Sequence, residues 1–135
     1  MLIDKLAWIY LKDGKILSTL SKGKDTRYIP GGKREGKETD RQALYREINE
    51  ELSVELIENT FEYYGTFQAQ AHGKQSWVIV QMTCYFAEYD GILKASSEIQ
   101  AYDWFSYKDK DRSSDVDKLI FEDLYKKWLI DNIDG

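Results

Sequence analysis

The sequence has 135 residues, a formal net charge of −5 and a pI near 5.0, and 42% of its residues are hydrophobic. This length fits one domain with an ordinary core, so we expect residues 1–135 to form a single domain. The acidic balance argues against stable binding to nucleic acid, and no apolar run approaches the roughly 18 residues that a membrane span needs.

Two features of the sequence bear on where in the cell the protein is found. The single cysteine, Cys84, excludes an internal disulfide and suits a reducing environment. Asp4 and Lys5, close to the first residue, argue against a secretory signal. We therefore expect a cytoplasmic protein.

The chain opens with a predicted β-hairpin. Residues 6–11 and 16–20 are two apolar runs joined across Asp13-Gly14, a typical hairpin turn. Residues 30–32, Pro-Gly-Gly, then interrupt regular structure and allow the backbone to approach a ligand closely.

A helix is predicted to begin near Thr39, which has the capping-box spacing to Gln42. Leu44, Ile48 and Leu52 form one stripe along this helix and should pack against a sheet. The helix then has a charged face beside its apolar face, which places the charged face at the rim of the sheet.

The second half of the chain predicts further strands and a helix. Residues 61–70 and 76–89 are long segments rich in Tyr, Phe, Val and Ile, with residues 72–74 as the turn between them. Residues 91–93 and 102–105 predict two shorter strands.

A second amphipathic helix is predicted at residues 115–133. Its buried side should consist of Val116, Leu119, Ile120, Leu124, Trp128 and Leu129. Strands, helix, strands and helix in this order indicate an α/β or α+β sandwich, with a mixed sheet flanked by two helices. Composition does not determine the strand order within that sheet.

The most informative residues for function are three glutamates on the first helix. Glu47, Glu50 and Glu51 stand at i, i+3 and i+4, so their carboxylates share one face. Such carboxylates repel one another unless a positive charge lies between them. Oxygen ligands suit a hard cation, Mg²⁺ or alternatively Mn²⁺, and protein-bound Mg²⁺ usually meets substrate phosphates. The sequence therefore indicates a metal-dependent enzyme that acts on a phosphate compound.

These residues resemble the Nudix hydrolase family, and its MutT-like members in particular, whose pattern is G-x5-E-x7-R-E-U-x-E-E-x-G-U with U aliphatic. The sequence matches this pattern at Gly32, Glu38, Arg46, Glu47, Ile48, Glu50, Glu51 and Val54. The departure is Ser53, where the family has glycine. A serine in the same left-handed conformation would cost roughly 1 kcal/mol. The order of elements is also similar to the Nudix fold, an α/β/α sandwich around a mixed sheet.

The resemblance implies roles for the residues of the pattern. Arg46 would orient Glu47, which would bind metal or activate water, although Arg46 could also simply pair with Glu50 one turn away. Glu50 and Glu51 would bind metal together with the backbone carbonyl of Gly31. We expect Glu38 to stabilise the start of the helix rather than take part in the chemistry.

Further candidates lie outside the pattern. In MutT-like members a glutamate lies six residues before a Trp, the spacing of Glu98 and Trp104 here, so Glu98 is a candidate metal ligand or base; the alternative is a solvated loop residue. Arg27 and Lys33 flank the glycine bend, and with Gly32 they are candidates for substrate binding, although both could be ordinary surface charges.

Three residues receive no catalytic role. His72 is the only histidine, and a lone loop histidine is more often incidental than catalytic. Asp115 and Asp117 open the last helix near the place where some Nudix relatives have a base-recognising residue. We interpret them as a helix cap.

The function that the resemblance implies is hydrolysis of a nucleoside diphosphate linked to another group, with Mg²⁺ as cofactor. We expect a nucleoside triphosphate as the substrate, an oxidised one included, whereas ADP-ribose, dinucleoside polyphosphates and sugar nucleotides remain open. A non-catalytic nucleotide-binding module is the rival function, and a calcium-binding structural protein is a weaker one because no EF-hand pattern is present. A homodimer is compatible with this fold, although no residue indicates one.

Overall fold

The computed structural model describes residues 1–71 and 77–131. One sheet has the order β5–β1–β8–β7 and is mixed, because β1 and β8 run parallel while the other neighbours run antiparallel. Its strands are Gly31–Lys33 (β5), Leu2–Ile9 (β1), Ile79–Phe86 (β8) and Glu62–Gln70 (β7). The predicted turn at residues 72–74 lies outside the described residues.

A second sheet is antiparallel, with the order β10–β3–β2, and β4 pairs with β3. Its strands are Ile99–Phe105 (β10), Lys15–Ser21 (β3), Leu11–Lys12 (β2) and Arg27–Tyr28 (β4). The turn between β2 and β3 confirms the predicted hairpin turn, because Asp13 and Gly14 have φ angles of 53° and 75°, the left-handed pair that such a turn requires. The first strand of this hairpin is shorter than predicted, because residues 6–9 belong to β1 and pair in the other sheet.

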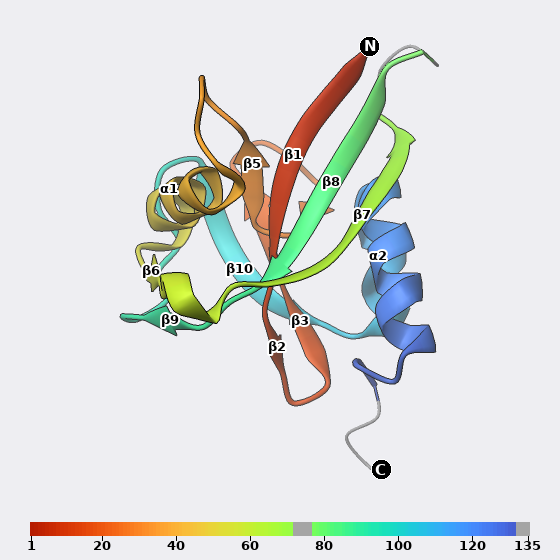
Figure 1. Cartoon of the computed structure of the whole chain (residues 1–135). Helices are drawn as coiled ribbons and strands as arrows, with labels where there is room; N and C mark the ends of the chain where they lie inside the picture. Colours follow the sequence, from red (N-terminus) through yellow and green to blue (C-terminus); the bar gives the residue numbers. More distant parts are fainter. Residues whose placement is uncertain (72–76, 132–135) are drawn as a thin grey trace.

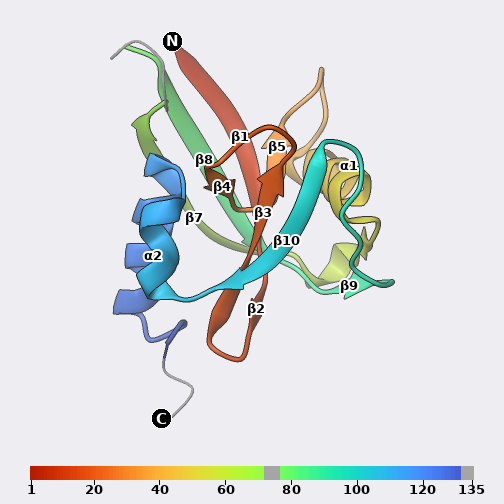
Figure 2. The same ribbon diagram turned by 180° about the vertical axis from the view of Figure 1, so that it is seen from behind.

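The helices α1 (Asp40–Leu52) and α2 (Asp115–Lys126) lie on opposite sides of the sheets, which confirms the predicted sandwich (Figures 1 and 2). Each covers its own apolar cluster. Leu44 and Ile48 of α1 pack with Trp8 of β1, whereas Ile120 and Phe121 of α2 pack in the other cluster. None of the helices in the described part of the chain has the length and apolar character of a membrane span.

Helix α1 begins and ends as its sequence predicts. Thr39 and Gln42 form the capping box, and Leu44, Ile48 and Leu52 are buried. Ser53 caps the C-terminus with φ 61°, so the serine does adopt the left-handed conformation that favours glycine. The burial of this stripe fixes the rotation of α1 and thereby the direction in which its glutamates point.

Helix α2 is shorter than predicted, because the chain turns at Trp128 (φ 61°) and the Leu129 N–H closes the helix end on the Leu124 carbonyl. Trp128 and Leu129 are therefore exposed and Ile130 is buried in their place, so the prediction was wrong for both. Leu119 is also exposed, at 44%, because the buried stripe of α2 is centred toward Asp117 and Phe121.

Small elements complete the fold and correct one predicted strand. Glu55–Leu56 (β6) pairs with Tyr89–Asp90 (β9), and short 3-10 helices occupy Glu58–Thr60 (η1) and Tyr107–Arg112 (η2). The strand predicted at residues 91–93 does not form, because Gly91 has φ 108° and turns the chain away after β9.

Candidate active site

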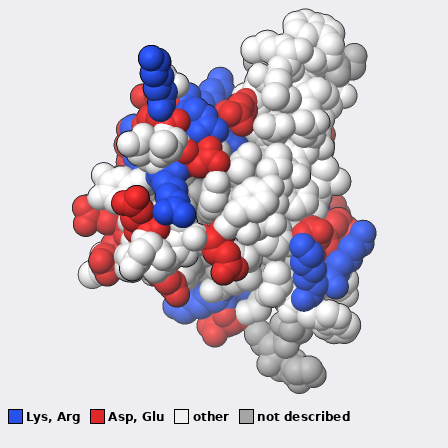
Figure 3. Space-filling model, viewed as in Figure 1, with Lys and Arg blue, Asp and Glu red and all other residues white. Residues whose placement is uncertain are grey.

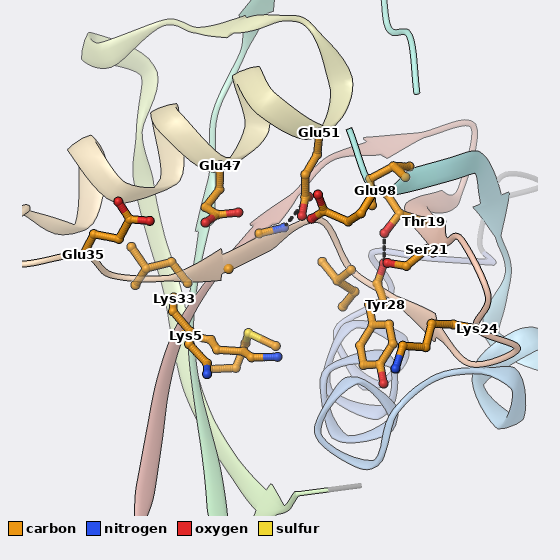
Figure 4. A pocket seen from close by; sticks show the side chains of 16 residues that line it. Lys5, Thr19, Ser21, Lys24, Tyr28, Lys33, Glu35, Glu47, Glu51 and Glu98 are labelled. Atoms are coloured by element: carbon orange, nitrogen blue, oxygen red, sulfur yellow. Dashed lines mark hydrogen bonds between the residues drawn. The ribbon is translucent and has the colours of Figure 1, made fainter. Parts of the chain in front are cut away.

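A cavity of about 450 Å³ opens between α1 and the sheet at the glycine bend. Charged side chains gather on the α1 side of the molecule, while the surface over the upper parts of β8 and β7 is largely uncharged (Figure 3). The cavity has two chemically different walls (Figure 4). One wall carries Glu35, Glu47, Glu51 and Glu98, and the opposite wall carries Lys5, Lys24 and Lys33.

Glu47 lies directly against the backbone of Gly32. A Cβ atom added at Gly32 would lie 2.4 Å from the Glu47 Cδ, so only glycine leaves room for this carboxylate. Arg46 Nη1 donates to Glu47 Oε1 at 3.0 Å, which fixes the orientation of the carboxylate. Burial raises the pKa of Glu47 despite this ion pair.

Glu51 is the most buried carboxylate of the acidic wall, at 7% exposure. Its Oε1 accepts a hydrogen bond from the Gly31 N–H at 3.2 Å. Burial raises the pKa of Glu51 to about 8, and the charges of Glu47, Glu98 and Glu50 add to the effect. Gly31 is itself required here, since an added Cβ would lie 2.0 Å from the Leu6 carbonyl oxygen.

Arg46 joins the glycine bend to the helix. Its Nε and Nη2 donate to the two carboxylate oxygens of Glu38 at 2.8 and 3.0 Å, and Nη2 also donates to the Lys33 carbonyl at 3.1 Å. The bonds from Arg46 hold the pKa of Glu38 at about 2. Glu38 thus secures Arg46, a different role from the predicted stabilisation of the helix start. Glu50 lies 3.6 Å from Arg46 with 54% of its side chain exposed, outside the lining of the cavity.

Glu98 comes from a distant part of the sequence and reaches the cavity because its loop is tied to the end of α1. The N–H groups of Lys94 and Ser96 donate to the last carbonyls of α1, those of Leu52 and Glu51, at 2.9 Å each. Ser97 Oγ then donates to Glu98 Oε2 at 2.8 Å. Glu98 and Glu51 consequently share one wall of the cavity.

Asp117 is not the helix cap that its position predicted. Ser114 is the N-cap of α2, and Asp117 is fully buried. The Ile29 N–H donates to its Oδ2 at 2.9 Å, whereas Oδ1 has no partner among the described residues. Burial raises the pKa of Asp117 to about 7. Asp115 is not the cap either, because it is the first residue of α2; it is exposed and pairs with Lys118 at 3.5 Å.

The comparisons with known proteins fit this geometry. The family model described as the NUDIX domain matches residues 5–124. The chain belongs to the Nudix family. Its residues are 33% identical to the CTP pyrophosphohydrolase of Escherichia coli over 109 residues, 78% of this chain and 76% of that protein.

Solved structures of other Nudix proteins share the fold. The solution structure of the E. coli ORF135 protein is similar with a TM-score of 0.73 and 30% identity, covering 93% of this chain and 89% of that one. The MutT protein of Methanosarcina mazei has a TM-score of 0.74 with 17% identity, covering 93% and 94%, and shows the fold alone. This chain is therefore a MutT-like Nudix pyrophosphohydrolase, from a family that uses divalent metal and acts on small nucleotides.

Whether the cavity can bind the metal expected for a Nudix enzyme depends on the donor atoms of its side chains. Within the described residues no three side chains of His, Cys, Asp or Glu form a ready-made metal cluster. Arg46 holds Glu47, and the Gly31 N–H holds Glu51, so these carboxylates face one cavity without converging. The chemistry nevertheless fits a hard divalent cation, because a buried carboxylate with a raised pKa is stabilised when a cation reaches it. Gly31 as a carbonyl ligand stays a prediction.

The basic wall differs from the sequence expectation. Lys33 lines the cavity as predicted, whereas Arg27 does not, because its guanidinium lies over the Phe105 ring at 5.6 Å and Nη1 is buried. Lys5 and Lys24 were missed. Lys5 could have been found, since it interrupts the apolar register of Ile3 and Ala7 on one face of β1. His72 lies outside the described residues.

Proposed function

We propose that this Nudix enzyme hydrolyses nucleoside triphosphates to a nucleoside monophosphate and pyrophosphate, with Mg²⁺ as cofactor. The observation that carries the proposal is the pair of opposed walls in one cavity, with Glu47 and Glu51 of α1 among the carboxylates and Lys5 and Lys33 of the sheet among the lysines (Figure 4). In the described part of the chain, Lys5, Lys24 and Lys33 form no salt bridge, so their charges are free to meet phosphates. The E. coli relative, a CTP pyrophosphohydrolase, supports CTP as the first substrate to test.

The acidic wall supplies the ligands in this proposal. Glu47, Glu51 and Glu98, with Glu50 at the rim, would hold the cation. A divalent cation held there would neutralise phosphate oxygens and would make a nearby water easier to deprotonate. Glu98 accepts the proton of the attacking water in our proposal. Arg46 acts by positioning, because its bonds to Glu38 and to the Lys33 carbonyl keep Glu47 in place.

A second cavity of about 260 Å³ adjoins the first. It supports the proposal that the substrate has a nucleoside at one end of its phosphate chain. It has apolar walls from Ile3, Val80 and Val116, and polar groups from Gln70 and Ser114. Apolar surface with a few polar groups is the composition of a small-molecule site. Asp117, whose Oδ1 has no partner among the residues that the structure describes, follows directly after Val116 in α2.

The experiment that tests the proposal is a substrate panel. Purified protein with Mg²⁺ is incubated with CTP, GTP, ATP, ADP-ribose, a dinucleoside tetraphosphate and a UDP-sugar, and the products are separated by chromatography. We expect a nucleoside triphosphate to give the highest kcat/KM and EDTA to abolish turnover. A higher kcat/KM for one of the other compounds would replace the substrate, and binding without turnover would favour a regulatory module.

A further inference from the structure

Lys5 occupies a position on β1 where the fold otherwise places apolar side chains. On this strand Ile3, Ala7 and Ile9 belong to the cluster that packs beneath α2, and Lys5 lies in the same register between them. Its cross-strand neighbours are Lys33 on β5 and Met82 on β8. Lys5 is thus held in the middle of the sheet and not at an adaptable edge.

The ammonium of Lys5 has little within the protein to stabilise it. Burial lowers the pKa of Lys5, while Asp117 from α2 and Glu51 and Glu47 from α1 oppose the effect and Lys33 adds to it. None of the salt bridges and side-chain hydrogen bonds in the described residues includes Lys5, and its nearest ring contact is Tyr28 at 5.8 Å. A half-buried cation without a salt bridge or hydrogen bond among the described residues is costly, so an anionic ligand offers a physical reason for it.

Lys5 also stands where the two cavities join. The cavities share five lining residues, which are Lys5, Lys24, Tyr28, Lys33 and Met82. Figure 4 shows the ends of Lys5 and Lys33 on the sheet side of the cavity, facing Glu47, with Lys24 beside the Tyr28 ring. A molecule that extends from the acidic wall into the second cavity must therefore pass Lys5.

We propose that Lys5 is a specificity-determining residue that binds the phosphate chain of the substrate at the junction of the two cavities. The inference rests on the proposed function, since it takes a nucleoside triphosphate as the substrate. With Lys33 and Lys24 it gives the basic wall three cations in reach of one chain, and this number of cations favours triphosphates over less charged nucleotides. Because the contact is present in the ground state and in the transition state, its loss raises KM and leaves kcat nearly unchanged.

A purely structural role is the alternative, in which Lys5 only compensates the buried charge of Asp117. The Lys5→Met variant keeps the length of the side chain and removes the charge, and Lys15→Met is the matched control on an exposed position of β3. The same substitution is made in an Asp117→Asn background, where the charge of Asp117 no longer needs compensation. Thermal unfolding reports whether each variant folds.

The measurements are kcat and KM for CTP with Mg²⁺, and calorimetric binding of inorganic triphosphate in EDTA. We expect Lys5→Met to raise KM and to weaken triphosphate binding, each by about tenfold or more, while kcat changes less than about threefold. The same effects are expected in the wild-type background and in the Asp117→Asn background. Lys15→Met should have the kcat, KM and triphosphate affinity of the wild type. Unchanged KM and triphosphate binding in Lys5→Met, or a defect that disappears with Asp117→Asn, would overturn the inference.

The two proposals fail in different ways. If wild-type protein hydrolyses no nucleoside triphosphate while Lys5→Met still loses triphosphate binding, the substrate assignment is wrong and the anion site stands. If the wild type hydrolyses CTP and Lys5→Met behaves like it in both measurements, the substrate assignment stands and the role of Lys5 is wrong.

Discussion

Ser53 Oγ lies 2.7 Å from Ser96 Oγ and joins the C-terminal cap of α1 to the loop that carries Glu98. A glycine, the residue that the Nudix pattern has at this position, could not make this bond. The serine thus compensates for its left-handed backbone by a contact that supports the cavity.

Substitutions at Ser53 should separate these two effects. Ser53→Ala keeps the left-handed cost and loses a hydrogen bond worth about 1 kcal/mol, so it should destabilise by about that amount. Ser53→Gly loses the same bond and removes a backbone cost of roughly 1 kcal/mol, so its stability should equal that of the wild type. Urea unfolding measures both, and an alanine variant as stable as the wild type would show that the bond contributes nothing.

Glu51→Gln should lower kcat by several orders of magnitude with the fold intact. The amide can still accept the Gly31 N–H bond but loses the charge that a cation needs, and burying a neutral group is less costly than burying a charge. Steady-state kinetics with Mg²⁺ and thermal unfolding test the two parts. Glu62→Gln, on an exposed position of β7, is the matched control and should keep wild-type activity.

Gly32→Ala should impair catalysis more than folding. The added methyl would lie 2.4 Å from the Glu47 carboxyl carbon and must displace that side chain. Gly36→Ala, in the loop that follows β5, is the control: the added methyl meets no atom within 4 Å, and the only cost is that of a left-handed backbone with φ 55°. The ratio of kcat/KM between these variants is the measurement, and equal values would mean that Glu47 can move without consequence.

Arg46→Lys should lose most of the activity although the charge is kept. A single ammonium cannot hold both oxygens of Glu38 and also reach Glu47 and the Lys33 carbonyl. We expect kcat to fall by at least about tenfold, with KM for Mg²⁺ also raised because Glu47 is no longer fixed. A lysine variant with full activity would reduce Arg46 to a surface ion pair.

The raised pKa of Asp117 predicts how the stability of the protein depends on pH. Its pKa rises from 3.8 in the unfolded chain to about 7 in the fold, so the folded state binds the extra proton between these values. The contribution of Asp117 to stability is therefore present below pH 4, falls as the pH rises toward 7, and stays low above it. Urea unfolding of wild type and Asp117→Asn at pH 5 and pH 8 measures this contribution. The free energy of unfolding of Asp117→Asn, relative to that of the wild type, should be higher at pH 8 than at pH 5.

Local signals in the sequence predicted α1 and its acidic face well. The capping box of Thr39 and Gln42 and the stripe of Leu44, Ile48 and Leu52 depend on residues a few positions apart, and the structure confirms both. The spacing of Glu47 and Glu51 follows from the same helix, so both reach the cavity.

The residues that sequence reasoning missed depend on distant parts of the chain. Asp117 has the sequence position of a cap, but Ser114 caps the helix and the stripe of α2 turns Asp117 inward to the Ile29 N–H. Arg27 lies near the glycine bend in sequence, yet the pairing of β4 with β3 places it over Phe105. The placement of Arg27 is set by strand pairing, and that of Asp117 by the packing of α2 against the loop at Ile29; neither composition nor periodicity encodes such long-range contacts.

The attachment of Lys94 and Ser96 to the last carbonyls of α1 has a consequence for how the enzyme acquires activity after synthesis or denaturation. Helix α1 can form from local contacts, but Glu98 reaches its position only after β10 has paired with β3, across most of the sequence. During refolding the circular dichroism signal of the helices should therefore recover before turnover does. Catalytic competence would then mark completion of the slowest, long-range step.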